Sequence, residues 1–74
     1  NNKEFQLMEY FMMNSNQVLS TELIMEKVWG LDSDAEINVV WVNISSLRKK
    51  LASIEANVTI KSARGLGYQL IVEA

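Results

Sequence analysis

The sequence predicts a small, mainly helical α+β domain in which three helices are followed by a β-hairpin. Apolar residues recur at helical spacing in three stretches of residues 1–54. Residues 58–62 and 68–72 instead alternate with period two on either side of a glycine-bearing turn. Because 74 residues with 49% apolar composition can build only one small core, we expect residues 1–74 to form a single domain.

The first predicted helix covers residues 1–13, with Asn1 as N-cap and Glu4 at the capping-box position. Its apolar side chains cover about 160° of the helix, which is wide for a surface helix. These are Phe5, Leu7, Met8, Phe11 and Met12. We therefore expect contacts on two sides, and a domain truncated at its N-terminus whose preceding segment covers one of them. The alternative is a complete chain with a loosely covered helix.

A turn cluster at residues 14–17 separates this helix from a second one at residues 21–29. Ser20 is a suitable N-cap with Glu22 in the first turn, and Gly30 is placed to stop the helix. We expect its core-facing residues to be Leu23, Ile24, Val28 and Trp29.

The third and longest helix is predicted from Ser33 to Ile54, with Ser33 and Glu36 as a capping pair. At about 100° per residue, one arc is apolar and should be buried. It comprises Ile37, Val40, Ile44, Leu47, Leu51 and Ile54. We place Trp41 at the margin of this arc, packed or in a cation–π contact with Arg48 rather than against a base.

The opposite arc of the third helix contains no acid and combines short polar groups, methyl groups and ammonium groups. It comprises Asn38, Val39, Val42, Asn43, Ser46, Lys49 and Lys50. A surface of this chemistry suits the major groove of DNA, which is negative and presents polar edges and thymine methyl groups.

The hairpin turn is Arg64-Gly65-Leu66-Gly67, with Arg64 near the tip. In the second strand, Tyr68, Leu70 and Val72 share one face. The two glycines do not form a nucleotide-binding fingerprint, because a strand, a glycine loop and a helix do not follow each other here.

The net charge of −2 is unevenly distributed. Residues 1–36 contain two lysines and seven acidic residues (−5), whereas residues 37–74 contain five basic and two acidic residues (+3). This asymmetry predicts one acidic and one basic surface on the same fold. Two solvated faces without a partner would give the same pattern.

Several function classes have little support. The sequence contains no cysteine and no histidine, so it has no disulfide framework, thiolate nucleophile or soft metal site, and we predict neither a cofactor nor an enzyme. Asp32, Asp34 and Glu36 resemble the start of a calcium loop, but the glycine and the distant glutamate of that motif are missing. No apolar run approaches the ~18 residues of a membrane span, so we expect a soluble, cytoplasmic domain without a membrane partner.

The order of the elements is that of a winged helix-turn-helix domain. In that arrangement the long helix enters the major groove, and the hairpin lies against the backbone or the neighbouring minor groove. The two basic regions would then face the same way, which predicts sequence-specific binding of double-stranded DNA. The alternative is a winged-helix module that binds protein through Val39, Val42 and the acidic first half.

The sequence also resembles, over nearly its whole length, the DNA-binding output domain of OmpR/PhoB-type response regulators. The matching blocks are Lys3-Glu4-Phe5, Val18-Leu19-Ser20, Val28-Trp29-Gly30, Leu47-Arg48-Lys49-Lys50-Leu51 and Arg64-Gly65-Leu66-Gly67-Tyr68. The resemblance implies a bacterial two-component transcription factor, in which phosphorylation of a receiver domain drives head-to-tail dimer binding to direct repeats. It also implies a small sheet before the first helix, which is absent from this chain and would cover the wide apolar arc.

Position by position, the resemblance implies base or nearby phosphate contacts at Asn38, Val39, Val42, Asn43 and Ser46. It implies phosphate contacts at Arg48 and Ser62, and a minor-groove approach by Arg64. Lys49, Lys50 and Lys61 complete the predicted DNA-binding surface. Many members contact RNA polymerase through the loop that corresponds to Gly30, Leu31, Asp32, Ser33 and Asp34, although favourable helix-dipole interactions would also explain these acids.

Four positions depart from the family pattern: Asn38 replaces a common arginine, Trp41 an aspartate, Asn43 a histidine and Ser46 a frequent basic residue. Relative to the family pattern, this chain lacks two likely cations on the third helix. Their absence would reduce the slope of log affinity against log salt concentration by roughly one unit per lost contact. Because Asn43 can pair with adenine, and Val39 and Val42 can meet thymine methyl groups, we expect A·T-leaning half-sites.

Overall fold

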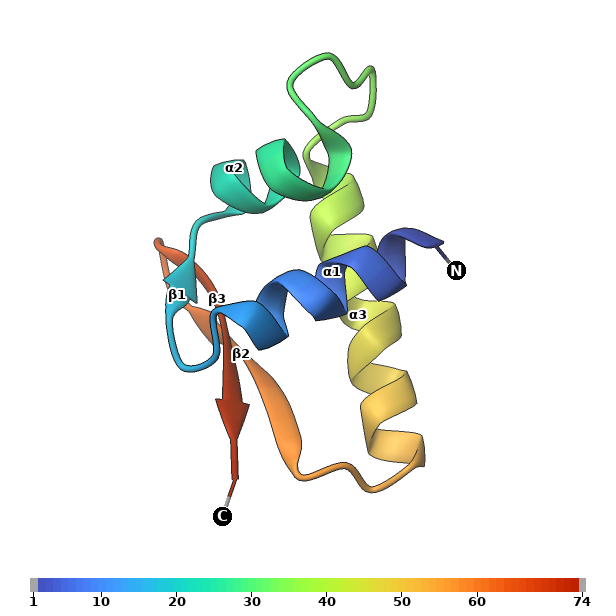
Figure 1. The fold of residues 1–74 in the computed structure, drawn as a ribbon, viewed down its shortest axis with the longest axis vertical. Helices are drawn as coiled ribbons and strands as arrows, with labels where there is room; N and C mark the ends of the chain where they lie inside the picture. Colours follow the sequence, from blue (N-terminus) through green and yellow to red (C-terminus); the bar gives the residue numbers. More distant parts are fainter. Residues whose placement is uncertain (1, 74) are drawn as a thin grey trace.

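The computed structural model describes residues 2–73, which form three helical segments and a three-stranded antiparallel sheet (Figure 1). The helices are α1 (Asn2–Met13), α2 (Thr21–Ile24) continued by the π-helical turn η1 (Met25–Trp29), and α3 (Asn38–Ser53). The strands are β1 (Val18–Leu19), β2 (Val58–Ala63) and β3 (Gly67–Val72). The predicted order of three helices and a hairpin, here called the wing (residues 58–72), is confirmed.

The core lies where α1, the α2–η1 segment, α3 and the sheet meet, and each of them contributes buried side chains. The most completely buried side chains are those of Leu7, Phe11, Ile24, Val40, Ile44 and Leu70. Because side chains from segments far apart in the chain interlock here, the core fixes α3 against both α1 and the sheet.

The second helix begins and ends at the predicted residues. The Ser20 hydroxyl accepts a hydrogen bond from the Leu23 amide at 3.0 Å, which is the N-cap contact. Gly30 ends the helix with φ +96°, and its amide donates to the Met25 carbonyl at 3.0 Å, the five-residue spacing of a π-turn. One prediction was wrong: Leu23 is 37% exposed, because the core-facing side of this short segment is occupied by Ile24 and Val28.

The third helix begins at Asn38 and not at Ser33. The Ser33 hydroxyl accepts a hydrogen bond from the Ala35 amide at 3.1 Å, which satisfies Ser33 in a local turn instead of at a helix N-terminus. Residues 31–37 therefore form a loop that projects from one end of the molecule (Figure 1). Ile37 and Ile54 flank the helix and are 49% and 73% exposed, so their predicted burial was wrong.

The short strand β1 was not predicted. Val18 and Leu19 pair with Gln69 and Tyr68 of β3, which makes β3 the central strand. Gly67 permits this close approach: a Cβ atom on it would lie 2.7 Å from Ser20 Cα and closer still to the Leu19 carbonyl oxygen. Its φ of +150° also disfavours any side chain.

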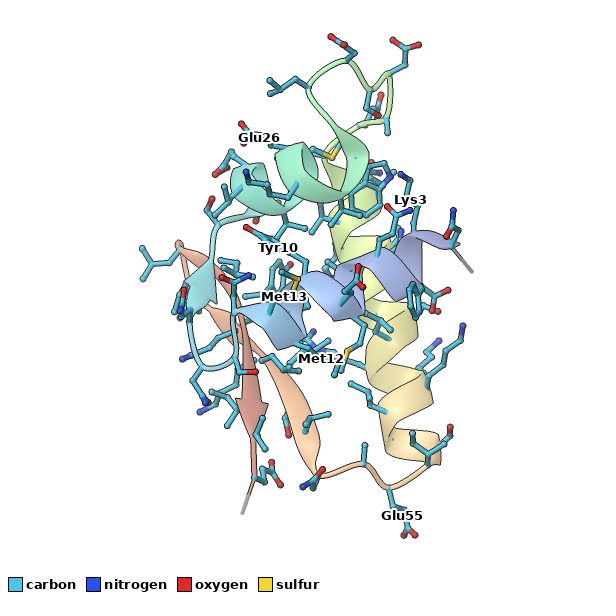
Figure 2. The ribbon with its side chains drawn as sticks, in the orientation of Figure 1. Lys3, Tyr10, Met12, Met13, Glu26 and Glu55 are labelled. Carbon is cyan, nitrogen blue, oxygen red and sulfur yellow. The ribbon has the colours of Figure 1, made fainter. Side chains whose placement is uncertain are left out.

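The wide apolar arc of α1 is confirmed, and its outer part is exposed. Leu7 and Phe11 are fully buried, whereas Phe5, Met12 and Met13 are exposed; Figure 2 shows the last two near the C-terminal end of α1. That a preceding segment covers this side remains a prediction. No helix among residues 2–73 combines the length and the apolar character needed to cross a membrane.

Gly67→Ala tests the close contact between β1 and β3. We expect it to lower the free energy of unfolding by about 2–4 kcal/mol, because the new methyl group must displace backbone atoms of β1. Urea unfolding followed by circular dichroism measures the loss. Gly65→Ala is the matched control: its φ is +77° but nothing lies within 4 Å, so only about 1 kcal/mol should be lost. Equal losses in the two variants would contradict the contact.

Candidate nucleic-acid interface

Polar contacts on both flanks fix how α3 is rotated about its axis. On the flank that faces α1, the Ser46 hydroxyl donates to Glu4 Oε1 at 2.9 Å, and Lys50 Nζ lies 2.9 Å from the same oxygen. On the flank that faces the wing, Arg48 donates to two groups of β2. The side of α3 between these flanks and opposite the core therefore faces solvent.

Glu4 is the buried anchor of the first flank and is only 5% exposed. Hydrogen bonds from Lys50 and then Ser46 lower the pKa of its carboxyl and outweigh the raising effect of burial. Asn1 and Glu4 were predicted to form a capping box at the start of the first helix, but Asn1 lies outside the described residues. The contact with α3 was not predicted, because its partners are more than 40 residues away in sequence.

Arg48 joins α3 to both strands of the wing. Its Nε donates to the Ile60 carbonyl at 3.0 Å, its Nη2 donates to the Ser62 hydroxyl at 3.0 Å, and its guanidinium lies 5.8 Å from the centre of the Tyr68 ring. The predicted cation–π contact with Trp41 was therefore wrong, since Tyr68 supplies the ring. Trp41 is 59% exposed instead of packed.

The rotation of α3 divides the predicted groove-facing residues into two groups. Asn38, Val42 and Lys49 are exposed on the outermost side of the helix. Val39, Asn43 and Ser46 are half-buried towards α1, and the Asn43 amide donates to the Val39 carbonyl at 2.9 Å. Trp41 and Ser45 lie on the side towards the wing. Ser45 did not appear in the predicted arc, which was centred too close to α1.

The wing presents polar and basic side chains at its tip. β2 and β3 pair up to Ala63 and Gly67, and the turn at residues 64–66 is closed by a hydrogen bond from the Leu66 amide to the Ala63 carbonyl at 2.8 Å. Arg64 occupies this turn and is exposed, as predicted. Lys61 and Ser62 are also exposed on β2.

The basic groups of α3 and the wing differ in how far they are neutralised. Lys50 pairs with Glu4, so its charge is partly compensated within the protein. Within residues 2–73, Lys49, Lys61 and Arg64 form no ion pair with a carboxylate. Most acidic side chains instead lie on α1, on the α2–η1 segment, where Figure 2 labels Glu26, and in the projecting loop. Glu55 and Glu73, which follow α3 and β3, are the exceptions, so the structure separates the two charge signs in large part, as the sequence indicated.

The loop predicted to contact a polymerase stands apart from the wing. Leu31 is 84% exposed, and Asp32 and Asp34 are exposed beside it, whereas Gly30 and Ser33 are half-buried. The loop projects at the N-terminal end of α3 (Figure 1).

A family model described as "Transcriptional regulatory protein, C terminal" matches residues 1–70. The chain belongs to this family. It is 45% identical over 69 residues to the heme response regulator HssR of Staphylococcus saprophyticus and to the transcriptional regulatory protein DltR of Streptococcus agalactiae. These matches cover 93% of this chain and 31% of each relative, so the chain spans about a third of their length.

Solved structures of DNA-binding domains share the fold. The DNA-binding domain of Bacillus subtilis CssR is similar with a TM-score of 0.81 at 30% identity, over 95% of this chain and 75% of that one. The Klebsiella pneumoniae RstA DNA-binding domain, solved in complex with the RstA box, gives 0.80 at 25% identity, over 99% and 73%. The winged-helix prediction is confirmed. Family membership makes this a non-enzymatic DNA-binding domain and does not favour the protein-binding alternative.

Glu4→Gln tests the anchor between α1 and α3. Because the pKa of Glu4 in the folded state lies below its ordinary value of 4.5, the ionised carboxylate stabilises the fold above that pH. This contribution disappears as the pH falls through the lowered pKa. We expect the variant to be about 1–2 kcal/mol less stable than the parent at pH 7, and the gap to narrow towards pH 3. Urea unfolding at several pH values measures this.

The matched control is Glu9→Gln, which removes an exposed carboxylate from the same helix. This variant should change stability by a few tenths of a kcal/mol at most. A gap between parent and Glu4→Gln that stayed constant from pH 7 to pH 3 would show that the charge of Glu4 does not stabilise the fold.

Proposed function

We propose that this domain places α3 in the major groove of double-stranded DNA and the wing against the sugar-phosphate backbone or the adjacent minor groove. The observation that carries the proposal is the Arg48 contact with Ser62, which joins the exposed side of α3 to the wing. A major groove about 12 Å wide admits one helix, and a wing held beside that helix meets the flanking backbone.

The proposed roles follow from exposure and charge. Asn38 and Val42 face outwards and are placed for base edges, with Val39, Asn43 and Ser46 reaching the same groove from the flank towards α1. Lys49 and the wing residues supply phosphate contacts, and Arg64 approaches the minor groove from the tip. The phosphate contacts of Lys61, Ser62, Arg48 and Lys50 complete the proposed surface.

We further propose that the domain is the output part of a bacterial two-component response regulator in the cytoplasm. The relatives named as response regulators are about three times as long as this chain, which leaves room for a receiver domain that a phosphorelay controls. In the proposed assembly, two such domains bind direct repeats head to tail. The acidic loop at residues 30–34, in which Leu31, Asp32 and Asp34 are exposed, then contacts RNA polymerase.

Binding to a duplex selected from random sequence should weaken steeply as salt rises. Each phosphate neutralised by a lysine or arginine contributes about −0.9 to the slope of log affinity against log salt concentration. Among the described residues, Lys49, Lys61 and Arg64 form neither an ion pair nor a hydrogen bond within the protein, so these three alone should give a slope of about −3 per domain. The contacts proposed for Arg48 and Lys50, which also have partners within the protein, would steepen the slope towards about −4.5. Fluorescence anisotropy between 50 and 300 mM KCl measures it, and a flat response from folded protein would favour a protein partner over DNA.

Arg64→Ala tests the wing contact. We expect a loss of about 1–2 kcal/mol in DNA affinity across most sequences, because a backbone contact carries little base information. Lys27→Ala is the control: it removes the same charge from η1, where Lys27 lies 3.9 Å from Glu26 and away from the wing. If Arg64→Ala and Lys27→Ala bind equally well, the tip of the wing does not touch DNA.

A further inference from the structure

The two tryptophans of this chain lie in opposite environments. Trp29 packs against the core at the end of η1 and has the Lys3 ammonium 6.0 Å from its ring. Trp41 lies on α3 with 59% of its surface exposed. Exposing a large indole forgoes the stabilisation that its burial would provide, so the folded domain alone gives no reason for a tryptophan here.

Trp41 lies on the same side of α3 as the wing. Trp41, Ser45 and Arg48 follow the spacing i, i+4, i+7, which places them in one stripe along the helix. The last residue of this stripe donates to Ser62 of the wing. Trp41 therefore lies about two turns from the junction with the wing, in the N-terminal part of the helix that reads base edges in helix-turn-helix proteins.

Within residues 2–73 the Trp41 ring has no cation partner and its indole N–H has no hydrogen bond. The cation that could have reached it, Arg48, lies over Tyr68. Its exposed neighbours at i−3 and i−4 are Asn38 and Ile37, one polar and one apolar. The ring is therefore free to meet a ligand without breaking an existing contact.

The surroundings of Trp41 favour DNA over protein as that ligand. Residues 37–52 contain no acid, and the exposed side of the same helix carries Lys49. In the major groove the apolar feature is the C5-methyl group of thymine, which an apolar side chain recognises and which cytosine lacks.

We propose that Trp41 is a specificity-determining residue whose indole packs against a thymine methyl group in the major groove. The inference rests on the proposed DNA binding and deepens it, because it assigns one base preference to one side chain. Asn38 or Ser45 beside the ring would supply hydrogen bonds to the neighbouring base edge.

The decisive experiment removes only the methyl group. In the selected duplex, each thymine is replaced in turn by deoxyuracil, and affinities are measured for the parent and for Trp41→Ala. We expect one thymine position at which the parent loses about fourfold in affinity, as one buried methyl group predicts. In Trp41→Ala the same replacement should have no effect. If no position distinguishes the two proteins, the inference is overturned.

Fluorescence gives an independent test. Trp29→Phe leaves Trp41 as the single tryptophan, and the selected duplex should reduce its quenching by acrylamide at least twofold. Trp41→Phe, which retains the core Trp29, should show no such protection. Protection of Trp41 that depends on protein concentration without DNA would assign the ring to a second copy of the chain and overturn the inference.

The two proposals fail differently. If the parent binds the duplex but Trp41 remains accessible to acrylamide, only the thymine contact is wrong. If the folded parent binds no duplex selected from random sequence, both the proposed function and the thymine contact are contradicted. Circular dichroism of each variant confirms that the fold is retained, as expected for a substitution at an exposed position.

Discussion

The proposed binding surface depends on the side chain of Arg48. It begins on α3, donates to a backbone carbonyl and a hydroxyl of β2, and lies over an aromatic ring of β3. Only a planar guanidinium can make these contacts together, because lysine offers a single ammonium without a flat face. The angle between α3 and the wing is therefore set before any ligand arrives, which reduces the ordering that binding must bring about.

Glu4 restrains α3 from the other side. Its carboxylate draws Ser46 and Lys50 towards α1, so part of the polar surface of α3 is used inside the protein. The outermost side of the helix is left to Asn38, Val42 and Lys49. Compared with a helix whose cations all face outwards, α3 therefore exposes fewer positive charges and relatively more apolar surface. In the proposed complex, this favours recognition of base shape and methyl groups over nonspecific attraction to phosphates.

The sequence predicted the architecture better than it predicted the surface. Helical and strand periodicity, the Ser20 cap, the Gly30 stop and the wing tip are local signals, and the structure confirms them. Strand β1 has only two residues, too few for any alternation to show. The predicted rotation of α3 about its axis was wrong by part of a turn. Glu4 and Tyr68 help to fix this rotation through contacts with α3, and both belong to segments that are distant in sequence. The start of α3 was also mispredicted, because the Ser33 hydroxyl accepts a hydrogen bond within its own loop and does not cap the helix.

The central claim is that one continuous surface, made of the exposed side of α3 and the wing, meets DNA. Amide chemical-shift changes in the ¹⁵N-labelled domain, titrated with a selected duplex, test this most directly. The account predicts the largest changes between residues 38 and 49 and between residues 61 and 66, with little change in α1 or the acidic loop. Changes concentrated in α1 or residues 31–36, with the wing unaffected, would contradict it.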